Sequence, residues 1–365
     1  MIFVLIGTTA ELIKLAPVIL ALQARSIKVV PIATGQNDLR KSDLYQIVFP
    51  NGIQHWITHR PIHQTTFSFL WWTIECFLKS PFLLKKLFRQ KKSVCPYLIV
   101  HGDTVSTLIG ALSAWLAGAK IVHVEAGLRS FNLLRPFPEE ICRMLVSKFT
   151  TLAFCPGKKA VGNLRAARGL QIIDTCENTL IDSLRFALSH PLCKHLTEYL
   201  PEKFFVCICH RQENLLDKNF LQTFMQYIED ASRELPCVTI LHKPTLQVFQ
   251  ELGLIERLES NGQILSLPRQ GYIDFTHILQ QSDYILTDGG SNQEECYYLG
   301  KPCLLLRKET ERHEGLGENV VLSYKKESII SKFLSNPSQW RRDPPAIHIQ
   351  PSELIAETLS HLLTS

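Results

Sequence analysis

Short apolar runs alternate with amphipathic stretches along the sequence, and they do so in two consecutive series. The first half contains IFVLIG, KVVPIATG, YLIVHGD, KIVHVEAG, LAFCPG and LQIID, and the second half contains FFVCICH, CVTILHK, QILSLP, DYILTDGG and PCLLLR. Runs that are apolar throughout, with helical patterns between them, are typical of parallel strands buried on both faces. Two such series predict an α/β protein with two doubly wound, Rossmann-like domains.

The length of 365 residues exceeds that of an ordinary single domain, which agrees with two. We predict an N-terminal domain over residues 1–178 and a C-terminal domain over residues 179–350. A last helix over residues 351–365 is expected to return to the first domain. Because ligands of open parallel sheets bind at the carboxyl ends of the strands, we expect the ligand in a cleft between the domains.

The composition excludes several classes of protein. A net charge of +5 is too small to indicate a nucleic-acid partner, although it suits anionic ligands. The 11 cysteines are scattered and include no CxxC pair, which is typical of free thiols in a reducing cytoplasm. Met1 leads directly into a strand-like run, and the apolar stretch between Arg60 and Glu75 is too short to cross a bilayer. We expect a cytoplasmic protein, soluble or peripheral to a membrane.

Two apolar strands of the first half each end on an acid, Asp103 and Glu125. One interpretation is that each acid caps the following helix, and Asp103 before TVSTLIGALSAWL suits that role. The other is chemical, since both acids would lie at one sheet edge. The neighbouring His101, His123 and Arg129 favour chemistry.

Strand ends of the second half carry polar groups as well. Gly289 and Gly290 open a helix, so a diphosphate could approach its backbone N–H groups. The strand CICH ends on His210 and Arg211, and His242 ends the next strand. A lone histidine at a strand end is usually structural, but three polar strand ends facing a Gly-Gly turn predict a nucleotide site.

Glutamates near the start of two helices have a structural and a functional interpretation. Glu294 and Glu295, in the helix after Gly290, could reach a ribose diol, or could complement the helix dipole. Glu139 and Glu140 follow Pro138, and at least one of them is expected to stabilise its helix.

Taken in order, these motifs resemble the UDP-N-acetylglucosamine 2-epimerase family, in its non-hydrolysing branch. The motifs are GTTAELIKLAP, HGDT, HVEAGLR, PFPEE, CHRQEN, LTDGGSNQEE, LGKP and TER, between residue 7 and about residue 320. The resemblance implies two domains of the glycosyltransferase-B (GT-B) type, with UDP bound mainly by the second. It implies epimerisation at C2 of a UDP-2-acetamido sugar, by elimination and return of UDP, for surface polysaccharide precursors. It also implies a homodimer that needs no metal or nicotinamide cofactor.

The resemblance assigns roles by motif position. Asp103, Glu125 and Glu139 match acid/base carboxylates, His210 matches an active-site histidine, and Glu295 matches a ribose-binding glutamate. The further candidates for binding UDP and substrate are Lys14, Arg129, Arg211, His242, Gly289, Gly290, Ser291 and Arg312.

The sequence departs from the family pattern at several motifs. Thr9 and Ala10 stand where the family has Arg and Pro, so an arginine that contacts phosphate is missing. The diphosphate turn reads Gly289-Gly290-Ser291 instead of Ser-Gly-Gly, and Glu177-Asn178 replaces Gly-Asn. The loop after TER, HEGLGENVVL, also lacks the usual Pro-Glu-Ala continuation.

The stretch from Thr65 to Pro96 has no counterpart in the family pattern, and we expect Ser80-Pro81 to divide it into two short helices. The helices either cover the first sheet, with their lysines solvated, or contact an anionic membrane through residues 65–92. The apolar residues are Phe67, Leu70, Trp71, Ile74, Phe77 and Leu78, and the basic residues are Lys79, Lys85, Lys86, Arg89, Lys91 and Lys92. Membrane contact would suit the alternative function, a GT-B glycosyltransferase with a UDP-sugar donor and a lipid-linked acceptor. A non-catalytic UDP-sugar-binding regulator is the third hypothesis.

Overall fold

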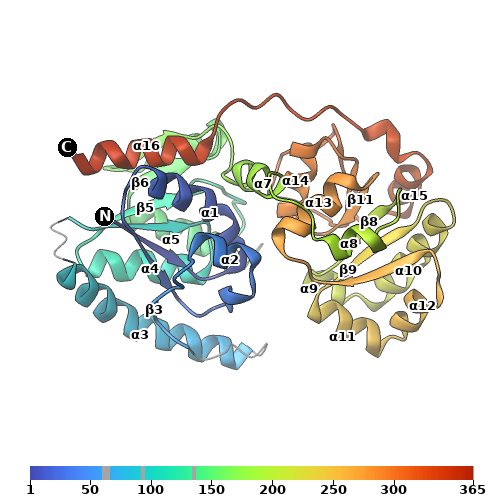
Figure 1. The fold of residues 1–365 in the computed structure, drawn as a ribbon, viewed down its shortest axis with the longest axis horizontal. Coiled ribbons are helices and arrows are strands. Elements are labelled where there is room, and N and C mark those ends of the chain that lie inside the picture. The colour runs from blue at the N-terminus through green and yellow to red at the C-terminus, as the bar shows by residue number, and fades with distance from the viewer. Residues whose placement is uncertain (60–65, 92–94, 134–136, 365) are drawn as a thin grey trace. The chain divides into compact units, whose positions relative to one another are not determined.

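The structure, a computed structural model, describes residues 1–59, 66–91, 95–133 and 137–364. The chain forms two compact units (Figure 1). Unit 1 comprises Met1–Ser183 and His348–Ser365, and unit 2 comprises Leu184–Ile347. The boundary lies inside helix α7 (Leu180–Leu188), so unit 2 is inserted between the two segments of unit 1.

Unit 1 contains a seven-stranded sheet in the order β3-β2-β1-β4-β5-β6-β7. Every neighbouring pair is parallel. The strands are β1 (Ile2–Ile6), β2 (Val29–Ala33), β3 (His55–Trp56), β4 (Tyr97–His101), β5 (Lys120–Val124), β6 (Thr150–Cys155) and β7 (Gln171–Asp174). Strands β1 and β4 are buried at every residue, as expected for central strands covered on both faces.

Helices cover both faces of this sheet (Figure 1). One face carries α3 (Thr66–Gln90), α4 (Val105–Leu116) and α5 (Glu139–Phe149), and their apolar side chains share a core with β1, β2, β4 and β5. The other face carries α1 (Thr9–Ala24), against which α16 (Pro351–Thr364) packs. The remaining elements of this unit are α2 (Asp43–Val48), α6 (Lys158–Leu164) and the 3-10 turn Leu39–Lys41.

Unit 2 contains a six-stranded parallel sheet in the order β10-β9-β8-β11-β12-β13. Its strands are β8 (Phe205–Ile208), β9 (Cys237–Leu241), β10 (Ile264–Pro268), β11 (Ile285–Thr287), β12 (Cys303–Leu305) and β13 (Val320–Leu322). Its helices are α8 (Lys194–Tyr199), α9 (Gln212–Leu215), α10 (Lys218–Ser232), α11 (Lys243–Glu251), α12 (Leu254–Ser260), α13 (Tyr272–Gln281), α14 (Gly290–Leu299) and α15 (Glu327–Ser335), with a 3-10 turn at Pro337–Trp340.

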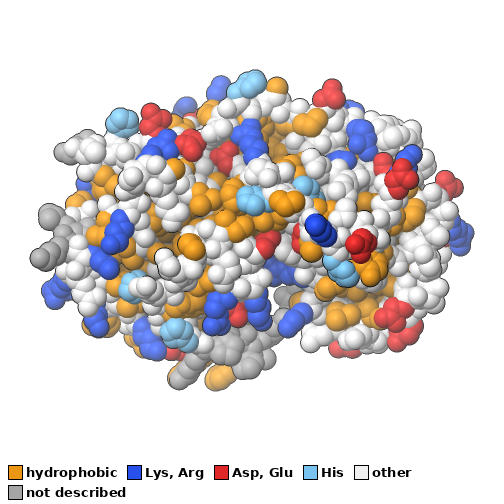
Figure 2. Space-filling view, viewed as in Figure 1, with side chains coloured by type: hydrophobic (Ala, Val, Ile, Leu, Met, Phe, Trp, Pro, Cys, Tyr) orange, Lys and Arg blue, Asp and Glu red, His pale blue; other side chains and the backbone are white. Residues whose placement is uncertain are grey.

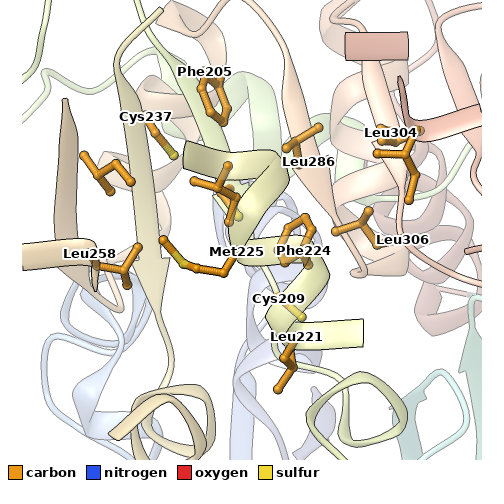
Figure 3. Close-up of a cluster of buried hydrophobic side chains, with 14 of the residues drawn as sticks. Phe205, Cys209, Leu221, Phe224, Met225, Cys237, Leu258, Leu286, Leu304 and Leu306 are labelled. Atoms are coloured by element: carbon orange, nitrogen blue, oxygen red, sulfur yellow. The ribbon is translucent and has the colours of Figure 1, made fainter. Parts of the chain in front are cut away.

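Alternation along β8 builds two cores in unit 2. Phe205 and Cys207 point to the face that α10 covers with Phe224 and Met225 (Figure 3). Val206 and Ile208 point to the opposite face, which α8, α13 and α14 cover. Burying one large apolar side chain contributes about 1.5–3 kcal/mol, so both helical layers stabilise the strand.

The prediction of two α/β units with parallel sheets is confirmed, and each predicted run contains a strand. The sequence interpretation missed β3 and β13, two short strands at the sheet edges. All eleven cysteines are free thiols, and eight are buried, whereas Cys95, Cys176 and Cys193 are exposed.

The predicted division at Ser80-Pro81 is wrong, because α3 continues through Pro81 as one helix. Buried residues lie on both sides of the proline: Trp72, Cys76 and Ser80 before it, and Leu84, Leu87 and Phe88 after it. Packing of this continuous inner side outweighs the roughly 3 kcal/mol that an interior proline costs. Lys92, one of the predicted basic residues, lies outside the described residues.

Candidate functional site

Each sheet has one point where strand order reverses direction, between β1 and β4 in unit 1 and between β8 and β11 in unit 2. Ligands of doubly wound sheets bind at the carboxyl ends of the strands beside such a point. The predicted site residues after β4, β5, β8 and β11 lie at these ends. Each unit therefore presents a group of polar side chains where its fold can bind a ligand.

Asp103 follows β4, and it does not cap the next helix as one interpretation predicted. The cap of α4 is Thr104, whose hydroxyl accepts a hydrogen bond from the Thr107 amide. The Asp103 carboxylate instead accepts from Arg143 Nε at 2.8 Å, and 27% of its side chain stays exposed. Asp103 is thus an oriented carboxylate that solvent or a ligand can reach.

Glu125 follows β5 and is held from several sides. Its Oε1 accepts from Lys14 Nζ at 2.7 Å and from Asn178 Nδ2 at 2.6 Å. Its Oε2 lies 3.1 Å from His101 Nε2. The backbone of Glu125 has φ +62°, a conformation that non-glycine residues rarely adopt. The structure brings Lys14 and Glu125 together, and it gives Asn178, which the sequence interpretation missed, a role in fixing the carboxylate.

The two glutamates that begin α5 differ in their surroundings. Glu140 is fully buried and accepts hydrogen bonds from Arg129 Nε and from the Ser130 amide. Although burial by itself raises the pKa of Glu140, these bonds leave that pKa below its usual value. Glu139 is half-buried at the first position of the helix. Glu140 is therefore the structural member of the pair, and Arg129, predicted to bind substrate, is engaged with it.

Glu11, in the first turn of α1, is a buried acid that the sequence interpretation missed. Its carboxyl accepts from the Gly7 amide at 2.6 Å and from Thr104 Oγ1 at 2.6 Å, which ties the end of β1 to the start of α4. Burial raises the pKa of Glu11 to about 7. Thr8 followed by Glu11 three residues later is the spacing of a capping box, and this signal could have drawn attention to it.

Asp288 organises the candidate site of unit 2, and the sequence interpretation missed it too. The fully buried carboxylate accepts from the amides of His210, at 3.0 Å, and Arg211, at 2.9 Å, and from Asn214 Nδ2 at 3.0 Å. It thereby joins the end of β11 to the end of β8. The available signal was an acid directly after an apolar strand, the same pattern as Asp103.

The rings of His210 and His242 stack, with centroids 4.8 Å apart. Burial lowers the pKa of His210, and burial together with the neighbouring His210 and Arg269 lowers the pKa of His242 to about 4. Both imidazoles are therefore neutral at pH 7. His210 Nδ1 lies 3.2 Å from Asp288 Oδ1.

The turn into α14 depends on glycine at position 289. A β-carbon on Gly289 would lie 2.3 Å from Oδ1 of Asn292, which is too close for any side chain. Asn292 Oδ1 accepts from Thr287 Oγ1 at 3.0 Å. Gly290 and Ser291 begin the first turn of the helix, the end at which backbone amides can bind an anion.

Glu295 and Glu294 are both buried in the second turn of α14, and they have different partners. Glu295 Oε2 accepts from Asn292 Nδ2 at 2.9 Å. Glu294 forms an ion pair with Arg312, which was predicted to bind substrate. Asn292 thus links the glycine turn to the carboxylate predicted to bind ribose.

The chain is similar to known proteins over most of its length. A sequence model of a family described as UDP-N-acetylglucosamine 2-epimerase matches residues 84–343. A UDP-N-acetylglucosamine 2-epimerase of Methanococcus maripaludis is 31% identical over 364 residues, which cover 92% of each chain. A UDP-2,3-diacetamido-2,3-dideoxy-D-glucuronate 2-epimerase of Pseudomonas aeruginosa is 31% identical, covering 73% of this chain and 75% of its own.

Two solved structures share the fold over nearly the whole chain. The UDP-GlcNAc 2-epimerase of Methanocaldococcus jannaschii, in complex with UDP-GlcNAc and UDP, has a TM-score of 0.79 and 27% identity, and covers 99% of both chains. The Neisseria meningitidis enzyme bound to UDP-GlcNAc has a TM-score of 0.78 and 25% identity, and the match covers 100% of this chain and 99% of the other. These matches confirm the predicted GT-B-type pair of α/β domains and do not favour the glycosyltransferase alternative.

Proposed function

The chain belongs to the UDP-N-acetylglucosamine 2-epimerase family of isomerase-type enzymes, and on this premise we propose that it inverts C2 of a UDP-2-acetamido sugar, interconverting gluco and manno forms. The reaction removes the C2 proton and expels UDP to leave a 2-acetamidoglucal, and then returns UDP as a proton reaches the other face of C2. A C2 proton is weakly acidic, so the base must be close and shielded from water.

The carboxylates of unit 1 are the observation that carries this proposal. Asp103 and Glu139 exchange the protons at C2, Asp103 being oriented by Arg143 while keeping part of its surface exposed. Glu125 supports the site with a carboxylate fixed by Lys14 and Asn178. Because the partners of Glu125 are cationic or donate hydrogen bonds, they favour its ionised form. Glu125 therefore holds these partners in position and does not remove the proton from C2.

Unit 2 binds the UDP. Backbone amides at the start of α14 and the Arg211 guanidinium stabilise the charge on the departing diphosphate, and Glu295 accepts hydrogen bonds from the ribose hydroxyls. Thr9 and Ala10 supply no cation in the first turn of unit 1, so this charge rests more heavily on unit 2 than in the family pattern. Neutral His210 is placed at the same strand end to donate or accept a proton.

Incubation with UDP-N-acetylglucosamine in deuterated water tests the proposal. NMR should show deuterium at C2 and a manno product, and Asp103→Asn should abolish both while retaining UDP binding. Neither deuterium nor manno product from the unmodified protein would contradict the proposal. Free sugar together with UDP would identify the hydrolysing type of reaction.

The setting of the reaction follows from its substrate. UDP-sugars are made in the cytoplasm, and we expect the enzyme to act there, as a homodimer, on precursors of surface polysaccharide. Light scattering of the purified protein checks the oligomeric state, because a dimer has twice the 41.6 kDa mass of the chain.

A further inference from the structure

The outer side of α3 exposes an unusual run of large apolar side chains. Phe67 and Phe82 are each 77% exposed, and Leu78 is 62% exposed. Residues three or four positions apart lie on one side of a helix, so these side chains are neighbours. We name this surface the α3 apolar face, and it comprises Phe67, Leu70, Trp71, Ile74, Phe77, Leu78 and Phe82.

The exposure of this face is not explained by packing of the helix on the sheet. The opposite side of α3 already supplies Trp72, Cys76 and Leu84 to the core of unit 1, and Trp72 Nε1 donates to the Thr34 carbonyl at 3.2 Å. Two adjacent tryptophans therefore differ in environment: Trp72 is 3% exposed and Trp71 is 54% exposed. Soluble proteins rarely leave such a contiguous apolar surface uncovered unless it binds something.

Positive charge gathers toward the C-terminal end of the α3 apolar face. Glu75 is the one acidic residue of this helix, and Lys79 pairs with it at 2.5 Å. The exposed cations of the helix and its end are Lys79, Lys85, Lys86, Arg89 and Lys91. Figure 2 shows basic and apolar side chains together at the lower left, where α3 lies in Figure 1.

We propose that α3 docks this protein on the surface of an anionic lipid bilayer, with the apolar face in the headgroup region and the lysines on lipid phosphates. A helix that is apolar on one side and rich in Lys and Arg binds membranes in this way, lying in the plane of the interface. Among the described helices, none has the length and apolar character needed to span a bilayer, so the contact is peripheral.

The charge of the α3 apolar face favours binding to an anionic bilayer over binding to a second copy of the chain. Two copies of the face carry the same positive excess and repel each other, whereas an anionic bilayer supplies the opposite charge along its whole surface. Binding to a bilayer buries the apolar residues and pairs the cations with lipid phosphates. This proposal does not depend on the activity proposed above.

Vesicle sedimentation tests the proposal with the full chain. The protein should pellet with vesicles of phosphatidylglycerol and phosphatidylcholine, and much less with vesicles of phosphatidylcholine alone. Salt at about 0.5 M should release part of the bound protein, because it screens the attraction between the cations and the lipid phosphates. Tryptophan emission should shift to shorter wavelength on binding, and Trp71→Phe should remove most of this shift, because Trp72 is already buried.

Matched variants separate the face from the overall charge. Lys85→Glu with Lys86→Glu, and Trp71→Ser with Leu78→Ser, should each lower binding to the anionic vesicles at least tenfold. The control is Lys158→Glu with Lys159→Glu, an exposed lysine pair on α6 that makes the same change in net charge and should keep binding within twofold. Circular dichroism confirms that each variant is folded.

Three results would overturn the proposal. The first is no binding to anionic vesicles, the second is equal binding to neutral ones, and the third is an equal loss in the α6 control. A dimer that Trp71→Ser with Leu78→Ser converts to a monomer, without vesicle binding by the unmodified protein, would assign the face to self-association instead.

Discussion

The side-chain amide of Asn292 occupies the space that any side chain at position 289 would need, since a β-carbon on Gly289 would lie 2.3 Å from Asn292 Oδ1. The same amide donates to Glu295 through Nδ2. Glycine at this position, where the family pattern has serine, leaves room for the Asn292 side chain. Positions 289 and 292 are therefore coupled, because the side chain of one fills the space beside the other.

Gly289→Ala should destabilise the protein by about 1–3 kcal/mol, because the added methyl group overlaps a buried side chain. Asn292→Ala removes the overlapping atoms, so the double variant should be more stable than the sum of the single changes predicts, by about 1 kcal/mol or more. Urea unfolding of the four proteins measures this coupling. Strict additivity would show that the two side chains do not compete for space.

Asn292→Leu should weaken UDP binding about tenfold, because Glu295, the proposed ribose ligand, loses a hydrogen-bond donor at 2.9 Å that fixes its carboxylate. Isothermal titration with UDP gives the dissociation constant. The matched control is Asn261→Leu, which removes an amide bonded to Ser232 and should leave the affinity unchanged. An unchanged affinity in the Asn292 variant would mean that Glu295 holds its position without that bond.

Asp103→Asn and Glu140→Gln should separate catalysis from stability. The first should lower epimerase turnover at least about 100-fold, with the midpoint of thermal unfolding little changed, because it removes the carboxylate proposed to carry a proton. The second should destabilise the fold by about 3 kcal/mol, since it leaves Arg129 and Arg143 without their buried carboxylate. Turnover and thermal melts of both variants check the assignment, and the reverse pattern would refute it.

Glu11→Gln should change how stability depends on pH. The folded pKa of Glu11 is raised from 4.5 to about 7, so between these values the folded protein keeps a proton that the unfolded chain has lost. The contribution of Glu11 to the free energy of unfolding is fully present below pH 4.5 and is lost as the pH rises through 7. Relative to the wild type, the variant should therefore gain up to about 3 kcal/mol between pH 4.5 and pH 8. A difference that stays constant over this range would contradict the shift.

Pro81→Ala should stabilise the protein by about 1–2 kcal/mol, because α3 is one continuous helix and alanine restores an amide donor to its interior. Thermal and urea unfolding measure the gain. A loss of stability would indicate that the proline fixes a bend on which the packing of Leu84 and Phe88 depends.

The central strands could be predicted from the sequence because burial on both faces demands an unbroken apolar run, as in Tyr97–His101. The edge strands His55–Trp56 and Val320–Leu322 could not, because they are two and three residues long and no longer apolar run surrounds them. Pro81 misled the local interpretation because propensity acts within a few residues, whereas the stripe that keeps α3 helical extends from Trp72 to Phe88.

The candidate site divides in the same way. Asp103 and Glu125 could be predicted as site residues because each follows a strand, and the topology of a parallel sheet brings the ends of its strands to one edge. What distinguishes Glu139 from Glu140 is contact with Arg129 and Ser130, some ten residues away, which no local pattern contains. Asp288 was missed because the interpretation of this motif rested on the adjacent glycines, whereas the partners of Asp288 follow β8, far away in the chain.

Helix α16 packs on α1, and the Ser352 amide donates to Asp182 at 2.8 Å, although all of unit 2 lies between these segments in the sequence. During synthesis on the ribosome, unit 2 is therefore a contiguous segment that emerges before the last piece of unit 1. The packing of α16 on α1 can therefore form only after all of unit 2 has been synthesised. Until residues 351–364 leave the exit tunnel, the surface of α1 that α16 covers in the folded protein stays exposed.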